Sequence, residues 1–183
     1  MTVPNPDFEL IERFNAGDEA AFNDIVKKYQ KKIYWHARRM TGNHLDADEV
    51  VQEVLIVIYN NLKKFRFQSS LYTWIYRITS TRTLNFLNRN KVKKLMGIDE
   101  SRVYELATGE DIIHDIEQRE KFAKLEKKLQ KLPSKQREVF IMRNFDDMSY
   151  KEISDITGRS EGGLKANYFH AINKLTEMME NDE

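Results

Sequence analysis

The sequence predicts an all-α protein: two small helical domains joined by a flexible acidic linker, the C-terminal one a helix-turn-helix. Apolar residues recur at three- and four-residue steps in several segments, and no segment shows the alternation of a strand. Charge is also segregated. The net charge is +1, yet residues 1–62 sum to −3, 63–94 to +9, 95–120 to −6 and 121–183 to +1. We therefore place the domains at 1–94 and 121–183, with 95–120 as the linker.

Three helices are expected in the first 62 residues. Apolar side chains recur at helical spacing within residues 8–14, 22–40 and 50–62. The residues expected to end or cap these helices are Gly17, Asp18, Gly42, and Asp46 with Glu49 three residues later as a capping box.

Residues 63–94 carry nine Lys or Arg, no Asp or Glu, and six aromatic residues. Basic side chains neutralise phosphates and aromatic rings stack on bases, so this mixture suits a single-stranded or melted nucleic acid. The alternative is a solvated basic helix with its aromatic residues in the core. We expect an irregular loop over 63–70 and a helix from its cap, Ser70, to about Arg89.

The helix after Ser70 has three arcs at a hundred degrees per residue. One is apolar and should be buried. The polar, cationic arc is expected to be free for contact and holds Thr73, Arg77, Ser80, Thr81, Leu84 and Asn88. A third arc has no assigned partner and holds Tyr72, Tyr76 and Leu87.

Residues 95–120 contain eight acidic residues, two Arg, and a short helical pattern near 112–116. The acidity either discourages stray contacts of neighbouring nucleic-acid surfaces or only solubilises a tether.

The C-terminal domain reads as helices separated by short turns. A helix within 122–132 is halted by Pro133, and Ser134 can cap the next. Ser149 with Glu152 forms a capping box for a short helix, and Ser160 can cap a final helix reaching about residue 178. Two helices joined by a Gly-containing turn are typical of a helix-turn-helix, although many such pairs are only packing units.

The last helix has a polar face suited to duplex DNA. Small residues near its start would let the backbone approach, Asn pairs with adenine, and Lys or His reaches guanine or phosphate. The residues away from its buried stripe, with the two that precede it, are Arg159, Ser160, Gly163, Ala166, Asn167, His170 and Lys174.

Four stretches together are specific for one family: FNAGDEAAFNDIVKKY (14–29), DADEVVQEVLIVIY (46–59), FRFQSSLYTWIYRI (65–78), and LPSKQREVFIMRNFDDMSYKEISDITGRSEGGLKANYFHAINKL (132–175). In this order and spacing they resemble the extracytoplasmic function (ECF) group of bacterial RNA polymerase sigma factors. The resemblance covers nearly everything except 95–120. It implies a promoter-melting domain like sigma region 2 over 1–94 and a helix-turn-helix domain like sigma region 4 over 121–183.

The resemblance also implies a role for each surface. In the family, the acidic-polar face of one helix docks on the clamp helices of the largest polymerase subunit, which here assigns Asp48, Glu49, Gln52 and Glu53. Without the family, a solvated helix face would be the preferred interpretation of those four. The loop and helix that bind the minus-ten element and capture a flipped base would use Lys63, Lys64, Phe65, Arg66, Ser69, Thr73, Trp74, Arg77, Thr81 and Asn88. The minus-thirty-five element would be read by Arg159, Ser160, Gly163, Lys165, Ala166, Asn167, His170 and Lys174, in a domain that also meets the polymerase flap.

Some positions depart from the family pattern. Thr81 and Asn85 stand where Asn and Asp are most common, and Asn167 and His170 stand where Arg is frequent. Because a hydroxyl cannot offer the two-sided pairing of an amide, the promoter sequence is expected to differ.

No catalytic or cofactor motif is present. The chain has no Cys, no HExxH, no phosphate-binding Gly-rich loop and no GxSxG, and its four His have no metal-ligand spacing. The pair Asp146-Asp147 is expected in a turn, for helix capping or solvation. We therefore expect no enzyme activity, no cofactor and no metal.

No run of residues has the length of a signal or spanning segment, so a cytoplasmic protein without membrane insertion is expected. Its expected partners are core RNA polymerase and promoter DNA, as a duplex upstream element and a melted minus-ten strand. The family leaves open a separate anti-sigma factor, and we expect no sensory domain after the last helix.

Two other functions fit parts of the sequence. A one-component transcriptional regulator would bind duplex operators without polymerase, but it leaves residues 63–94 unexplained. A helical adapter without a DNA role fits the near-zero net charge but not the charge segregation, and its binding would be insensitive to salt.

Overall fold

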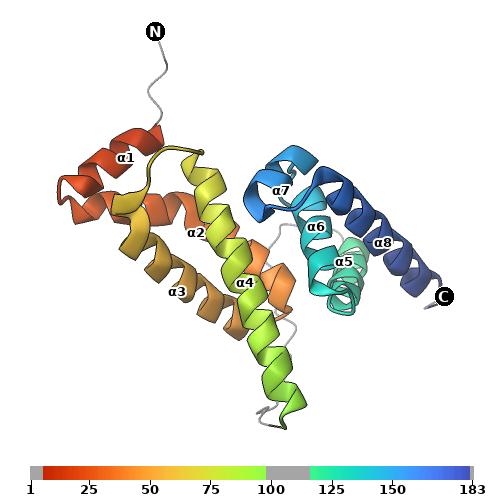
Figure 1. The fold of residues 1–183 in the computed structure, drawn as a ribbon. Coiled ribbons are helices and arrows are strands. Elements are labelled where there is room, and N and C mark those ends of the chain that lie inside the picture. Colours follow the sequence, from red (N-terminus) through yellow and green to blue (C-terminus); the bar gives the residue numbers. More distant parts are fainter. Residues whose placement is uncertain (1–5, 98–115, 182–183) are drawn as a thin grey trace.

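The protein is helical throughout the parts that the structure describes. This computed structural model describes residues 6–97 and 116–181, in which eight α-helices and one 3-10 turn occur and no strand is found. The helices are α1 (Pro6–Asn15), α2 (Glu19–Thr41), α3 (His44–Asn61), α4 (Leu71–Leu95), α5 (Ile116–Leu129), α6 (Ser134–Asn144), α7 (Tyr150–Thr157) and α8 (Glu161–Glu180), with the 3-10 turn η1 at Leu62–Lys64. Helices α1–α4 form one body and α5–α8 a second beside it (Figure 1). The all-α, two-body prediction is confirmed.

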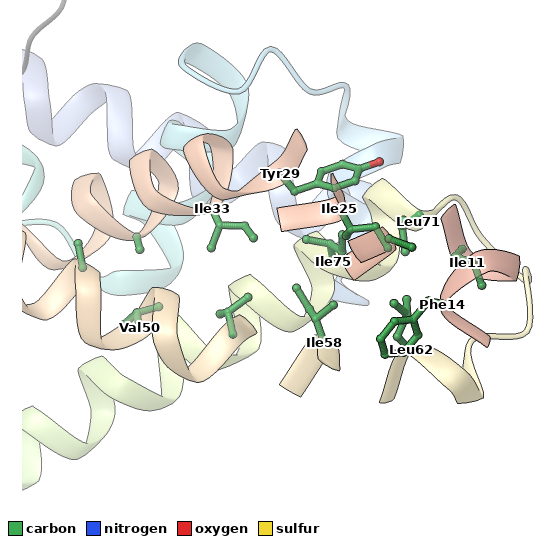
Figure 2. Packing of buried hydrophobic residues seen from close by; sticks show 14 of the residues in the cluster. Ile11, Phe14, Ile25, Tyr29, Ile33, Val50, Ile58, Leu62, Leu71 and Ile75 are labelled. Carbon is green, nitrogen blue, oxygen red and sulfur yellow. The ribbon is translucent and has the colours of Figure 1, made fainter. Parts of the chain in front are cut away.

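The first body has one apolar core, in which α1–α4 each bury one stripe. Figure 2 shows Ile25 and Ile33 of α2 facing Val50 and Ile58 of α3, with Ile75 of α4 close to them. All five are essentially inaccessible to solvent. Fully burying such a side chain contributes about 1.5–3 kcal/mol, so this core can hold the loop that follows η1 in place.

Local capping signals set most helix boundaries. Asp18 caps α2, Ser70 caps α4 by accepting from the Thr73 amide, and Gly42 ends α2 with φ +86°. The prediction of a capping box at Asp46 is wrong. The cap of α3 is Asn43, whose Oδ1 accepts from the Asp46 amide (2.8 Å) and whose Nδ2 donates to the Asp46 carboxylate (2.7 Å).

Helix α4 is longer than the sequence predicted. It continues past Arg89 to Leu95, because no Gly or Pro occurs before Gly97 and because Lys93 and Lys94 lie near the negative end of the helix dipole. The linker prediction also differs at its other end, since α5 already begins at Ile116. Most of the short helix expected near 112–116 lies outside the described residues.

The second body packs α5–α8 around two apolar clusters. Leu129, Phe140 and Leu175 belong to one, and Ile153 and Leu164 to the other. The predicted capping box is present, because the Glu152 amide donates to Ser149 Oγ and the Ser149 amide donates to Glu152 Oε2. The Ser160 cap of α8 is also confirmed.

The prediction that Ser134 caps α6 is wrong. Ser134 is the first residue of α6, and Pro133 supplies the extended residue before it without any side-chain capping bond. Proline already fixes φ near the helical value and has no amide hydrogen to satisfy, so the helix can start directly after it.

Candidate nucleic-acid interface

The basic loop after η1 is an exposed rim built on an aromatic anchor. Phe65 and Trp74 have ring centroids 5.3 Å apart and pack against the first core, whereas Lys63, Lys64 and Arg66 are exposed. A rigid aromatic base with cations around it can hold unpaired nucleic acid, because rings stack on bases and cations neutralise phosphates.

The polar arc of α4 is only partly free, because the second body contacts Arg77 and Ser80, whereas Thr81 and Asn88 remain exposed. Arg77 donates to the Asp155 carbonyl oxygen of α7 (2.7 Å), and Ser80 Oγ donates to Glu138 Oε1 of α6 (2.5 Å). Ser80 is buried, and Thr81 and Asn88 line a cleft of about 530 Å³ between α4 and the second body. Four residues of the arc expected to be free, Arg77, Ser80, Thr81 and Asn88, therefore lie at, or beside, a contact between the two bodies.

This inter-body contact, made by α2 and α4 with α5–α7, is polar as well as apolar. Tyr76 of α4 is 1% exposed and belongs to the same apolar cluster as Ile153 and Leu164. Burial, with Asp146 nearby, raises the pKa of the Tyr76 phenol, so its hydroxyl stays protonated at neutral pH. The unassigned third arc of α4 thus has a partner, the second body.

A buried histidine and aspartate join the bodies at a second point. His36 of α2 is 0% exposed, and its Nδ1 lies 3.1 Å from Asp146 Oδ2 in the turn after α6. The sequence predicted helix capping or solvation for Asp146. Both predictions are wrong for this residue, because its carboxylate pairs with His36. Such a contact cannot be inferred from local sequence, because 110 positions separate the two residues.

The C-terminal end of α2 is capped by the second body. Gln130 Nε2 donates to the Arg39 carbonyl oxygen (2.8 Å), and buried Arg137 donates to that of Met40. At Gly42 the side chain of Gln130 lies against the backbone, since a Cβ there would lie 2.7 Å from the Gln130 Cδ. Carbonyl groups of the last helical turn need partners, and here the second body provides them.

The α3 face assigned to polymerase carries mostly accessible polar groups. Glu49 and Gln52 are exposed, while Asp48 lies 3.1 Å from His44 Nε2 and Glu53 accepts from Arg89 of α4 (2.5 Å). The structure therefore gathers the four predicted side chains along one stretch of α3.

The helix-turn-helix presents α8 to solvent. Gly163, Lys165, Ala166, His170 and Lys174 are exposed along it. Asn167 is half-buried, and its Nδ2 donates to the Gly163 carbonyl oxygen (2.9 Å). Arg159 is engaged inside its own body, because its guanidinium donates to buried Glu138 and to the Lys135 carbonyl oxygen. Most of the predicted reading face is thus available to a duplex, and Arg159 is not.

Sequence reasoning missed three residues of these surfaces. Glu138 is 0% exposed and accepts from both Ser80 and Arg159, yet nothing in its local sequence marks it. Phe8 is an exposed aromatic side chain beside the basic loop, and Phe67 is an exposed aromatic side chain within it. Phe67 is one of the six aromatic residues of 63–94, but it was not assigned to the DNA surface.

Across residues 6–97 and 116–181, no three His, Cys, Asp or Glu side chains are grouped to hold a metal ion. Within the same residues no helix has the length and apolarity needed to cross a membrane.

Comparison with known proteins identifies the family. Residues 25–92 match the profile of Sigma-70 region 2, and residues 122–175 match that of Sigma-70, region 4. The RNA polymerase sigma-H factor of Pseudomonas aeruginosa is 30% identical over 181 residues, covering 93% of this chain and 92% of that protein. The ECF RNA polymerase sigma-E factor of Escherichia coli is also 30% identical, covering 93% of each.

The chain belongs to the ECF RNA polymerase sigma factors. SigW of Bacillus subtilis is a further relative of this sigma factor, 29% identical over 162 residues, covering 85% of this chain and 87% of SigW. The chain is thus an alternative sigma factor, which binds core RNA polymerase and promoter DNA for transcription initiation.

Two solved structures share the fold of this sigma factor. CnrH, in complex with the cytosolic domain of CnrY, has a TM-score of 0.70 at 20% identity, covering 97% of this chain and 99% of that one. RpoE of Bartonella quintana, in complex with the anti-sigma factor NepR, has a TM-score of 0.71 at 20% identity, covering 88% and 98%.

Proposed function

We propose that the two bodies of this sigma factor divide promoter recognition between them. Residues 1–94 engage core polymerase and the minus-ten element, residues 121–183 engage the minus-thirty-five element, and residues 95–120 connect them. The observation that carries this proposal is the uninterrupted cationic character of residues 63–94 around an exposed loop on an aromatic anchor. Duplex readers need no aromatic surface, whereas a melted strand does.

The minus-ten surface consists of the basic loop and the polar arc of α4. Lys63, Lys64 and Arg66 neutralise phosphates, while Phe65 and Trp74 provide stacking for an extruded base. Removing a base from the duplex costs a few kcal/mol, which stacking and phosphate contacts must offset.

The minus-thirty-five surface is the exposed face of α8. Asn167 and His170 are the candidates for base-edge contacts, and Lys165 and Lys174 are suited to phosphate. Arg159 acts here by positioning, because its pairing with Glu138 links the turn before α8 to α6.

The acidic-polar face of α3 is the polymerase contact. Asp48, Glu49 and Gln52 supply carboxylate and amide groups along one face, and Glu53 joins them once Arg89 exchanges its partner. These groups would pair with basic residues of the polymerase.

Promoter binding requires the inter-body contact to open. The second body buries Ser80 against Glu138 and holds exposed Arg77 through the Asp155 carbonyl oxygen, so both must exchange a partner to engage DNA. We therefore infer an open form in which the α4 arc is released, and polymerase and DNA stabilise it by binding groups that the closed form covers.

The catalytic chemistry belongs to the polymerase in this proposal, and the sigma factor contributes binding energy and DNA distortion in the cytoplasm. An anti-sigma factor is a candidate third partner, since RpoE of the same fold is bound to NepR.

A promoter selection tests this division. Holoenzyme assembled from the chain and core polymerase is mixed with fragments of its own genome, and bound fragments are sequenced. The proposal predicts two shared motifs at fixed spacing, bound only with polymerase present. A single motif bound tightly by the chain alone would favour the one-component regulator instead.

A further inference from the structure

Two phenylalanine rings from separate elements meet at the surface beside the basic loop. Phe8 of α1 is 50% exposed and Phe67 of the loop is 42% exposed, and their ring centroids lie 5.0 Å apart at 41°. Phe67 also lies 5.0 Å from Phe65, which contacts Trp74. A row of rings therefore runs from the core to solvent, and its outer end is uncovered.

The backbone at Phe67 is strained. Its φ of +54° lies in the left-handed region, which a bulky residue without hydrogen-bonding ability rarely adopts. Glycine or asparagine would occupy this position at lower conformational cost. Burial offsets the strain only in part, because the ring packs beside Phe8 and Phe65 but is still 42% exposed. Backbone strain that burial does not fully offset is typical of a residue held in place for binding.

The electrostatic surroundings favour a polyanion. Exposed Lys63, Lys64 and Arg66 flank the loop, and residues 63–94 contain no carboxylate side chain. The acid preceding Phe8 in sequence, Asp7, is turned inward: it accepts from Lys28 Nζ (2.5 Å) and the Tyr29 hydroxyl (2.8 Å). The Phe67 ring thus belongs to a segment whose only charged side chains are cations, whereas Phe8 is followed on α1 by exposed Glu9 and Glu12. The loop side of the ring pair therefore suits a nucleotide, with its flat base and its phosphate.

We propose that Phe8 and Phe67 form a stacking platform for an unpaired base of the melted promoter strand. The base stacks on the outer face of the pair, since rings 5.0 Å apart leave no room between them. This extends the DNA surface to α1, which lies outside the segment matching Sigma-70 region 2. The platform rests on the proposed function, because only an opened promoter supplies such a base.

The test compares two probes with assembled holoenzyme. One is a promoter fragment from the selection above with an unpaired minus-ten region, and the other is the same fragment fully paired. The informative variant is Phe67→Gly, because glycine adopts the observed φ without strain while the ring is lost. Phe67→Tyr keeps a ring, Phe8→Leu removes the second one, and Phe169→Leu alters an exposed phenylalanine on α8.

The platform predicts that Phe67→Gly and Phe8→Leu lower affinity for the unpaired probe by about tenfold, with less change on the paired probe. Phe67→Tyr should retain affinity, and Phe169→Leu should leave the ratio between probes unchanged. The melting temperature of Phe67→Gly should equal or exceed that of the parent. In addition, an iodouracil base in the unpaired strand should crosslink to Phe8 or Phe67 on irradiation.

Three results would overturn the platform. Unchanged affinity of Phe67→Gly for the unpaired probe would show that the ring does not meet a base. A marked fall in its melting temperature with equal losses on both probes would show that the ring only packs α1 to the loop. If the parent holoenzyme itself does not prefer the unpaired probe, the proposed function fails and the platform fails with it.

Discussion

Replacing Asp146 with alanine should open the sigma factor. The carboxylate lies 3.1 Å from Nδ1 of fully buried His36, and the two residues belong to different bodies. Hydrogen bonds to charged groups contribute about 1.5–3 kcal/mol. When the bodies separate, water solvates His36 and Asp146. Removing the Asp146 carboxylate therefore destabilises only the closed form. A loss of about 2 kcal/mol raises the ratio of open to closed molecules roughly 30-fold.

Fluorescence energy transfer between the two bodies would measure this shift. The natural chain has no cysteine, so Asn60→Cys on α3 and Asn173→Cys on α8 give unique, exposed labelling sites. The matched control is Asp147→Asn, which removes the same charge at the exposed neighbour. Asp146→Ala should lower transfer efficiency and increase binding of an unpaired minus-ten probe by the chain alone.

The reasoning would be refuted if Asp146→Ala and Asp147→Asn gave the same transfer efficiency as the parent while all three remained folded. The inter-body contact would then not depend on the His36 pair. Increased opening in both variants would instead assign the effect to net charge.

Three further predictions concern single elements. Ser149→Ala removes the cap of α7 and should cost the second body about 1 kcal/mol in urea unfolding. Hydrogen bonds from the Ser149 amide and hydroxyl lower the pKa of Glu152, so the part of the difference that comes from the hydroxyl–carboxylate bond is present above the ordinary carboxyl pKa and is lost as pH falls. The part that comes from the Glu152 amide donating to Ser149 Oγ should persist in acid, so the difference between parent and variant should shrink there without vanishing. Asn167→Ala or His170→Ala should weaken the preferred upstream element by about 1–3 kcal/mol per lost base contact in a binding selection, and an unchanged preference would contradict the assignment. Arg77→Gln should impair promoter opening, followed by permanganate reactivity, more than polymerase binding, and unimpaired opening would remove Arg77 from the DNA surface.

Helix positions could be predicted well because their signals are local. Ser70, Ser149 and Ser160 each bond to an amide three residues ahead, so a short window of sequence contains both partners. The capping role of Asn43 was missed for a related reason. The pair Asp46 and Glu49 has the same three-residue spacing as the pair Asn43 and Asp46, so the sequence offers two candidate caps for α3.

The inter-body contact could not be predicted. Tyr76 had the pattern of a third arc with no partner, and only the fold shows that α6–α8 cover it. In sequence Glu138 resembles any charged residue on a helix. In the structure it is buried and accepts hydrogen bonds from two distant residues, Ser80 and Arg159. Long-range pairs of this kind depend on how two helical bodies meet, and helical periodicity contains no information about that.

Run-off transcription is the most direct test of the central claim. Purified protein is added to sigma-free core polymerase with a pool of promoter fragments from its own genome. The account predicts transcripts from a subset that shares an upstream and a minus-ten motif, and none without the protein. A protein that neither binds core polymerase nor supports initiation, yet shifts duplex DNA by itself, would contradict the account.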